Sequence, residues 1–204
     1  MSTSALRHGA VPLAGRGDPA SIGLWAFIGV ATSLFSLFLA AYVMRMAESD
    51  WSSFAMPWQL WLSTGFLAAG SVALHQSSVL ARAGNWSRSR AWLLAGGVCA
   101  AAFLMSQLWA WQALRDLQVV FSNNPAASFF YLLTAMHGLH LLGGLAAWAV
   151  TAGGNWDPTE SNRTALRITL CARYWHFMLG VWLLLFGALG WLTPEMARFI
   201  CGRA

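Results

Sequence analysis

Five long apolar stretches dominate this sequence and restrict what it can fold into. They run approximately over Ile22–Met44, Trp58–Leu80, Ala91–Leu114, Ala126–Thr151 and Ile168–Leu192. Each reaches the roughly 20 residues that a helix needs to cross the hydrocarbon of a bilayer. Because lipid offers no hydrogen-bond partners, the backbone groups of such segments must bond within the segment, as they do in helices. The predicted fold class is therefore all-α, an integral membrane bundle of five transmembrane helices.

The rest of the chain divides around this predicted transmembrane domain, which covers residues 22–192. Residues 1–21 form a polar tail rich in glycine, alanine and proline, and residues 193–204 form a short C-terminal tail. The first apolar stretch is longer than the roughly 7–15 apolar residues of a signal-peptide core. We therefore expect it to be kept as a membrane span.

Charged residues are scarce and unevenly placed. They make up 9% of the 204 residues, whereas soluble domains carry about 25%. All basic residues are arginines: eight lie in the N-terminal tail and the second and fourth connections, and four lie on the opposite side. Since cytoplasmic segments carry the excess of positive charge, we expect a cytoplasmic N-terminus. The net charge of +5 is spread between the spans, so it does not indicate a nucleic-acid-binding surface.

The acidic residues argue against several classes of membrane protein. All seven carboxylates lie in tails, in connections or at the ends of the apolar stretches. Proton and ion pathways usually need an ionisable acid at depth, so a stand-alone pump or transporter is not expected. The sequence shows no Ser-His-Asp arrangement and no phosphate-binding loop, and its three cysteines lack the spacing of a metal site. We expect no catalytic, cofactor-binding or metal-binding residue in this chain.

Polar side chains recur at helical spacing within the apolar stretches. His137 and His140 lie three residues apart, so they share one helix face. The faces that carry His75 and His176 also carry small residues, which let helices approach closely in a membrane. We expect these faces to turn inward or toward a partner protein. The residues predicted to make polar contacts between helices are His75, Gln107, His137, His140, Trp175 and His176.

Haem ligation is the alternative role for these histidines. Imidazoles from two facing spans could serve as axial ligands of a haem iron. His137 and His140 lie on one helix and do not meet that requirement, although His140 and His176 could meet if their helices pack antiparallel. Structural hydrogen bonding is the simpler interpretation. A Soret absorbance band of the isolated chain would distinguish the two.

Two motifs in successive stretches resemble subunit III of the haem-copper oxidases of cytochrome c type. The first is His-Gly-Leu-His at residues 137–140, and the second is Tyr-Trp-His-Phe at residues 174–177 with Trp182 following. The resemblance covers nearly the whole of residues 23–192, and five spans with an inner N-terminus are similar to the short bacterial form. Further matching residues are Gly23, Leu24, Trp25, Ser71, His75, Gln107, Trp111 and Thr134.

Three positions depart from the pattern of this family. The family has a glutamate in the opening span, a second glutamate after its glutamine motif and an aspartate after the Tyr-Trp-His motif. This chain has Ala31, Ala110 and Leu179 at these positions. The resemblance therefore implies a divergent member that keeps the histidines of the scaffold and has lost its membrane carboxylates.

The resemblance also implies a function and partners. The chain would be a non-catalytic subunit in the bacterial inner (cytoplasmic) membrane, beside a catalytic subunit I that carries the haems and copper, with subunit II in the same complex. It would bind phospholipid and support electron transfer to oxygen and proton translocation by the assembly. Two alternatives stay open, namely an accessory subunit of a nitric oxide reductase and a haem b-binding membrane anchor of a dehydrogenase.

Overall fold

The computed structural model describes residues 19–52, 55–119, 125–154 and 161–202. Within these residues the regular structure is entirely helical, as the sequence predicts. The helices are α1 (Pro19–Met46), α2 (Gln59–Arg82), α3 (Trp86–Asp116), α4 (Pro125–Gly153), α5 (Ser161–Trp191) and α6 (Pro194–Ile200). Each of the five predicted stretches therefore corresponds to one long helix.

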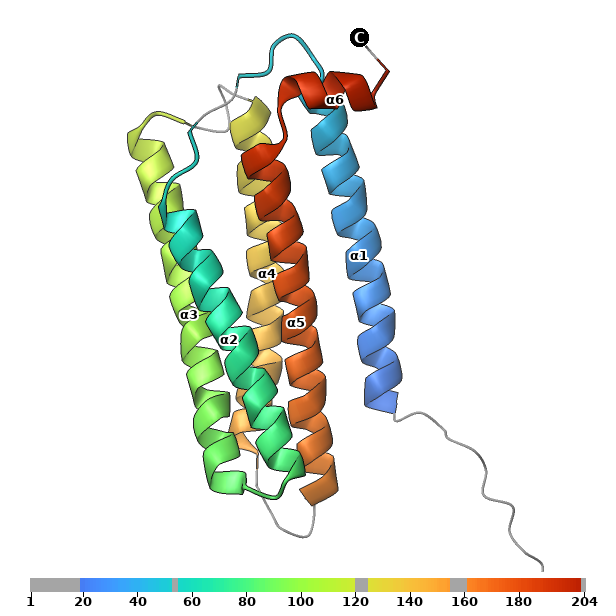
Figure 1. Cartoon of the computed structure of the whole chain (residues 1–204), viewed down its shortest axis with the longest axis vertical. Helices are drawn as coiled ribbons and strands as arrows, with labels where there is room; N and C mark the ends of the chain where they lie inside the picture. Colours follow the sequence, from blue (N-terminus) through green and yellow to red (C-terminus); the bar gives the residue numbers. More distant parts are fainter. Residues whose placement is uncertain (1–18, 53–54, 120–124, 155–160, 203–204) are drawn as a thin grey trace, which may run out of the picture.

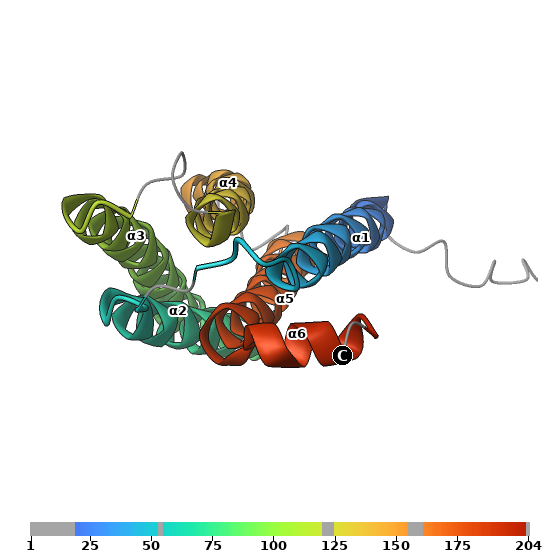
Figure 2. The same ribbon diagram turned by 90° about the horizontal axis from the view of Figure 1, so that it is seen from above.

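The long helices form a ring of four with a fifth helix outside it. α2, α3, α4 and α5 each pack against the next, and α5 closes the ring on α2. α1 lies outside the ring against α4 and α5 (Figures 1 and 2). The long helices alternate in direction, so α1 starts at one end of the bundle and α5 finishes at the other (Figure 1). The short helix α6 then lies across the end of α1.

Not every long helix has the composition of a membrane span. In the described part of the chain, α1, α3, α4 and α5 are long and apolar enough to cross a membrane. α2 has 24 residues but is not among them. Four of the five predicted spans therefore have the length and composition of a membrane span, and the count of five stays a prediction.

The predicted ends agree with most helix ends to within a few residues. α5 differs most, because it begins at Ser161, seven residues before the predicted start at Ile168. Its polar first turns continue the helix beyond the apolar stretch, where hydropathy no longer marks it. The predicted N-terminal tail lies outside the described residues except for its last three, which belong to α1.

The predicted C-terminal tail contains a helix that the sequence analysis missed. α6 follows Thr193, whose Oγ1 accepts a hydrogen bond from the backbone N–H of Met196 at 3.3 Å, and Pro194 occupies its first turn. Threonine as an N-cap followed by proline is a helix-start signal, so this element could have been predicted. Ala197 is buried and belongs to the apolar cluster that attaches α1.

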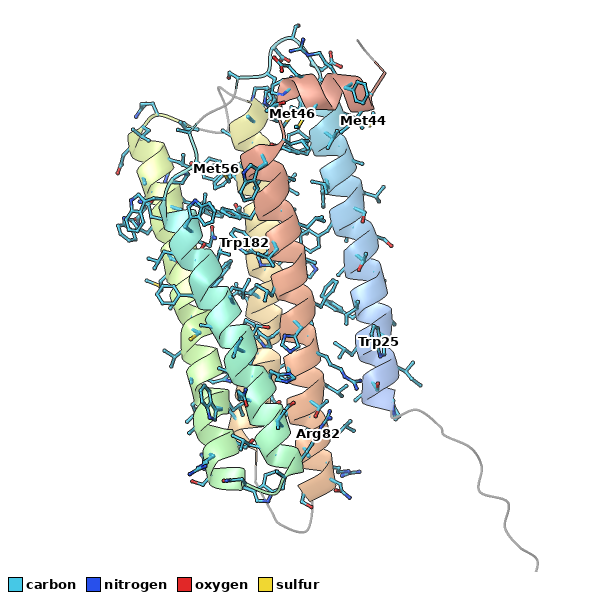
Figure 3. The ribbon with its side chains drawn as sticks, in the orientation of Figure 1. Trp25, Met44, Met46, Met56, Arg82 and Trp182 are labelled. Atoms are coloured by element: carbon cyan, nitrogen blue, oxygen red, sulfur yellow. The ribbon has the colours of Figure 1, made fainter. Side chains whose placement is uncertain are left out.

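A narrow stripe of buried side chains attaches α1 to the ring. The buried residues of α1 are Ala31, Phe35, Tyr42 and Met46, which fall on one side of the helix. Large apolar side chains are exposed along the rest of its length, including Trp25, which is 60% exposed (Figure 3). An apolar surface of this extent is typical of a helix that faces lipid.

Glycines allow close packing around α3. A Cβ atom at Gly96 would overlap Leu74 of α2, and a Cβ atom at Gly97 would overlap the ring of Trp148 from α4. Trp148 is held there because its Nε1 donates a hydrogen bond to the carbonyl oxygen of Leu93 at 2.8 Å. Two adjacent glycines therefore fix the distance of α3 from both of its neighbours.

Candidate functional site

A chain of three polar side chains joins α2 to α5. Ser71 Oγ lies 2.5 Å from His176 Nδ1, and His176 Nε2 lies 3.4 Å from His75 Nδ1. Ser71 is buried, whereas both imidazoles are exposed on the outside of the bundle. Ser71 and His75 are neighbours on α2 because they lie four residues apart, so one imidazole from α5 reaches both.

Two further hydrogen bonds extend this polar contact along the same helix pair. Toward one end of the bundle, Arg82 Nη2 donates to Thr169 Oγ1 at 3.2 Å. Toward the other end, Trp182 Nε1 donates to Thr64 Oγ1 at 2.9 Å. Figure 3 shows Arg82 near one end of α2 and Trp182 well above it. The polar residues of α2 thus meet those of α5 over most of the length of α2.

A second set of polar contacts surrounds α3. Gln107 Nε2 donates to Ser63 Oγ of α2 at 2.8 Å, while Gln107 Oε1 is buried without a partner among the described residues. Trp111 Nε1 donates to Thr134 Oγ1 of α4 at 3.1 Å. Trp111 and Thr134 belong to the matching family motifs, but the sequence alone did not indicate that they bond to each other.

His137 lies in the middle of the ring among aromatic side chains. It is completely buried, and neither of its ring nitrogens has a hydrogen-bond partner among the described residues. Its ring centroid lies 5.1 Å from that of Trp182, 5.7 Å from that of Phe103 and 6.2 Å from that of Phe35. His137 therefore contacts three other helices through ring packing and not through hydrogen bonds.

His140 and Trp175 also differ from the predicted interhelical bonding. His140 Nδ1 pairs with the carbonyl oxygen of Met136 at 2.7 Å, within its own helix. The contact between α4 and α5 at this level is a bond from the hydroxyl of Tyr174 to the carbonyl oxygen of His140, at 2.8 Å. Trp175 is fully buried, and its Nε1 has no partner among the described residues.

No three His, Cys, Asp or Glu side chains of the described residues lie close enough together to hold a metal ion. His176 finds its partners on α2, and His140 bonds within α4. Of the positions where the family has carboxylates, Ala31 and Ala110 are buried, and Leu179 is half-buried.

An apolar cavity of about 560 Å³ lies between α1, α4 and α5. Arg167 is among the residues that line it, and most of the other lining residues are apolar. A cavity of this size and composition suits an elongated apolar ligand with an anionic group. The sequence analysis did not find it, although Gly143 and Ala147 on one face of α4 leave part of its space. The main lining residues are Leu24, Phe27, Leu139, His140, Gly143, Leu170 and Tyr174.

These features together define a class of protein. Four long helices of spanning composition, apolar side chains exposed around the outside and polar side chains paired between helices are typical of a multi-pass membrane protein. The predicted multi-pass membrane location is confirmed at this level.

Comparison with known proteins then indicates the family. The chain is 26% identical to cytochrome c oxidase subunit 3 of Alkalihalophilus pseudofirmus over 171 residues, which is 81% of this chain and 82% of that protein. It is 26% identical to cytochrome c oxidase subunit 3 of a Synechocystis species over 178 residues, or 84% and 75% of the two chains. It is 25% identical to cytochrome bo(3) ubiquinol oxidase subunit 3 of Pseudomonas aeruginosa over 80% of each chain.

No family model matches the chain. The agreement with several subunit 3 proteins nevertheless extends over most of each sequence. This agreement supports the divergent resemblance to the subunit III family of haem-copper oxidases that the His-Gly-Leu-His and Tyr-Trp-His-Phe motifs predict.

Proposed function

We propose that this chain is the non-catalytic, subunit III-like component of a haem-copper terminal oxidase. It would stand beside the catalytic subunit I, which carries the haems and copper, with subunit II in the same complex. The observation that carries the proposal is the agreement with oxidase subunits 3 over 80% or more of the chain. Its role is to support the catalytic subunit while electrons pass to oxygen and protons are translocated.

The proposal includes five membrane crossings with a cytoplasmic N-terminus. α2 is the member of the ring that lies between α3 and α5, and it runs alongside both (Figures 1 and 2). We therefore expect it to lie at the same depth in the membrane. Its polar residues are bonded to these neighbours, which reduces the cost of placing them in hydrocarbon.

Reporter fusions test this topology. A periplasmic reporter fused in the connection between α2 and α3 should be inactive, because the proposed topology has that connection in the cytoplasm. The same reporter placed directly after α3 should be active. Activity of both fusions, or of neither, would contradict a crossing by α3 between them.

We further propose that the cavity between α1, α4 and α5 holds a phospholipid. Its apolar wall suits acyl chains, and Arg167 suits a phosphate group. Mass spectrometry of the detergent-purified oxidase should find retained phospholipid, and Arg167→Gln should lower its amount. Equal retention in the variant would contradict this assignment of the headgroup.

Deletion of the chain from its native host tests the proposed function. Membranes from the deletion strain should consume oxygen with an oxidase that loses activity faster during sustained turnover, and the intact chain supplied in trans should restore it. Unchanged oxygen consumption together with loss of nitric oxide reduction would instead support the accessory subunit of a nitric oxide reductase.

A further inference from the structure

The outer surfaces of α2 and α5 form one continuous strip of the bundle, which we call the α2–α5 face. The two helices lie side by side there, and α4 lies on the opposite side of the ring (Figure 2). The exposed residues that define this face are Gly65, Ala69, Val72, His75, Gln76, Arg173, His176, Gly180 and Leu183. Two imidazoles, one guanidinium group and one amide lie on this face, whereas the exposed polar side chains of α1 are the hydroxyl groups of Thr32, Ser33 and Ser36.

We propose that a transmembrane helix of the catalytic subunit covers this face, places a carboxylate against His75 and Arg173, and packs closely against Gly65 and Gly180. The proposal rests on the function proposed above, because it assigns the surface through which this chain joins its partner.

The polar part of the face lies farther from the end of the bundle than the Arg82–Thr169 pair does. His75 is seven residues from Arg82, and His176 is seven residues from Thr169, the hydrogen-bond partner of Arg82. At 1.5 Å per residue, both imidazoles lie about 10 Å deeper than that pair. Polar side chains at such depth rarely face lipid and normally meet protein.

The hydrogen-bond chain leaves one nitrogen for a neighbour outside the bundle. His75 Nδ1 faces His176 Nε2, and His176 Nδ1 faces the buried Ser71 hydroxyl. When Ser71 donates to His176, His176 donates to His75, and Nε2 of His75 carries the proton that remains. A carboxylate accepts from such a group more strongly than a neutral oxygen does.

The α2–α5 face carries the positive charge of Arg173, and the described helices supply no carboxylate on this face to pair with it. Arg173 is exposed one turn from His176 on α5. Among the described residues of α1 to α5, the one carboxylate is Asp116, at the end of α3. A carboxylate on the partner helix would therefore pair with Arg173 as well as with His75.

The other half of the face has the shape that close helix packing requires. A Cβ atom at Gly65 or at Gly180 would meet nothing within 4 Å, so no side chain of the described residues fills the space beside them. Open glycines let another backbone approach closely, which is how helices associate where lipid provides no hydrophobic drive. α2 is also the long helix whose composition is not that of a lipid-facing span. A covering helix explains both observations.

Site-specific photo-crosslinking in the intact oxidase complex tests the assignment. A benzophenone side chain replaces Val72 on the α2–α5 face or, as matched controls, Val98 on α3 or Val30 on α1. These three valines are 58%, 68% and 63% exposed, respectively. After illumination of native membranes, mass spectrometry identifies the attached peptide. We expect Val72 to attach to a transmembrane peptide of the catalytic subunit and the two controls to attach to lipid.

The possible outcomes separate the two proposals. If the catalytic subunit co-purifies but Val72 attaches only to lipid, or a control attaches to the catalytic subunit in its place, the docking surface is wrong and the proposed function stands. If no oxidase subunit co-purifies with the unmodified chain, the proposed function itself fails.

Charge variants test the carboxylate. Arg173→Gln should reduce the catalytic subunit recovered with the tagged chain by about tenfold, since loss of one member of a buried ion pair weakens a complex strongly. Arg173→Lys should restore much of the recovery, and Arg88→Gln, an exposed arginine at the start of α3, should have no effect. Equal recovery with Arg173→Gln and Arg88→Gln would overturn the predicted ion pair.

Discussion

His137 is a fully buried imidazole whose two ring nitrogens have no hydrogen-bond partner among the described residues. Its neighbours are the rings of Phe35, Phe103 and Trp182. An unsatisfied buried polar group costs about 1–3 kcal/mol. His137 therefore contacts its neighbours through ring packing, whereas His176 contacts its neighbours through hydrogen bonds.

This difference predicts opposite effects for the same substitution. His137→Phe should leave the free energy of unfolding unchanged or raise it by about 1 kcal/mol, because it removes an unsatisfied group and keeps a ring. His176→Phe should lower it by about 0.6–1.7 kcal/mol, because it removes the bonds to Ser71 and His75. Unfolding in mixed detergent micelles measures both. A larger loss for His137→Phe than for His176→Phe would contradict the assignment.

The buried Ala31 provides a second test of His137. It lies one turn from Phe27 and from Phe35, whose rings contact His140, so a longer side chain at residue 31 would point toward the histidines of α4. Ala31→Glu should therefore lower the free energy of unfolding less when His137 is present than in a His137→Phe background. We expect a coupling of about 1.5–3 kcal/mol in the double-mutant cycle. Additive effects of the two substitutions would show that the carboxyl does not reach the ring.

Asp50 forms an ion pair with Arg45 just after the end of α1. Arg45 Nη1 and Nη2 donate to its two carboxylate oxygens at 2.6 and 2.5 Å. These hydrogen bonds hold the pKa of Asp50 below its usual 3.8. A carboxyl whose pKa is lowered by folding stabilises the fold above the unfolded pKa and loses that contribution as the pH falls through the folded pKa.

The stability difference between the wild type and Asp50→Asn should therefore be constant near neutral pH and shrink below about pH 4. The pair is exposed to solvent, so we expect the difference to be small at any pH. Unfolding curves at pH 7 and pH 3 measure it. A difference that grows at pH 3 would contradict the assigned direction.

The sequence indicated the polar residues of the site better than it indicated their partners. His75, Gln107 and His176 have hydrogen-bond partners on another helix. His140 bonds within α4, and His137 has no partner among the described residues. Helical spacing tells which residues share a face. It does not tell which neighbouring helix meets that face, because that depends on the order of the helices around the ring.

At the scale of the helices, α3 depends on glycine for its contact with α4. Gly97→Ala places a methyl group inside the Trp148 ring, so we expect a loss of about 1–3 kcal/mol. Gly29→Ala on α1 is the matched control, since its Cβ atom would meet nothing within 4 Å and alanine favours the helix. Thermal unfolding of both variants measures the difference. Equal melting temperatures would show that Trp148 can move aside.

The helices themselves could be predicted from hydropathy, but two features of them could not. The first turns of α5 are polar and continue the helix beyond its apolar stretch. α6 has seven residues, which are too few to produce a long apolar stretch, and only the Thr193-Pro194 signal marks the start of this helix. The cavity between α1, α4 and α5 also follows from tertiary packing, because it depends on the narrow stripe by which α1 contacts the ring.

The whole molecule combines a closed ring of four helices with a loosely attached fifth. The ring carries the polar contacts between its helices, whereas α1 contributes a cavity and an apolar outer surface. Within the described residues no three His, Cys, Asp or Glu side chains lie close enough together to hold a metal ion. The supporting role proposed for this chain rests on its agreement with oxidase subunits 3.

Affinity purification of the tagged full-length chain from native membranes in a mild detergent tests this account most directly. The protein subunits are counted by quantitative mass spectrometry, and haem is counted by its absorbance. The account predicts one catalytic haem-copper subunit for each tagged chain, with haem present in the complex and absent from the chain after dissociation. A chain that purifies with a dehydrogenase, or that keeps stoichiometric haem when isolated, would contradict it.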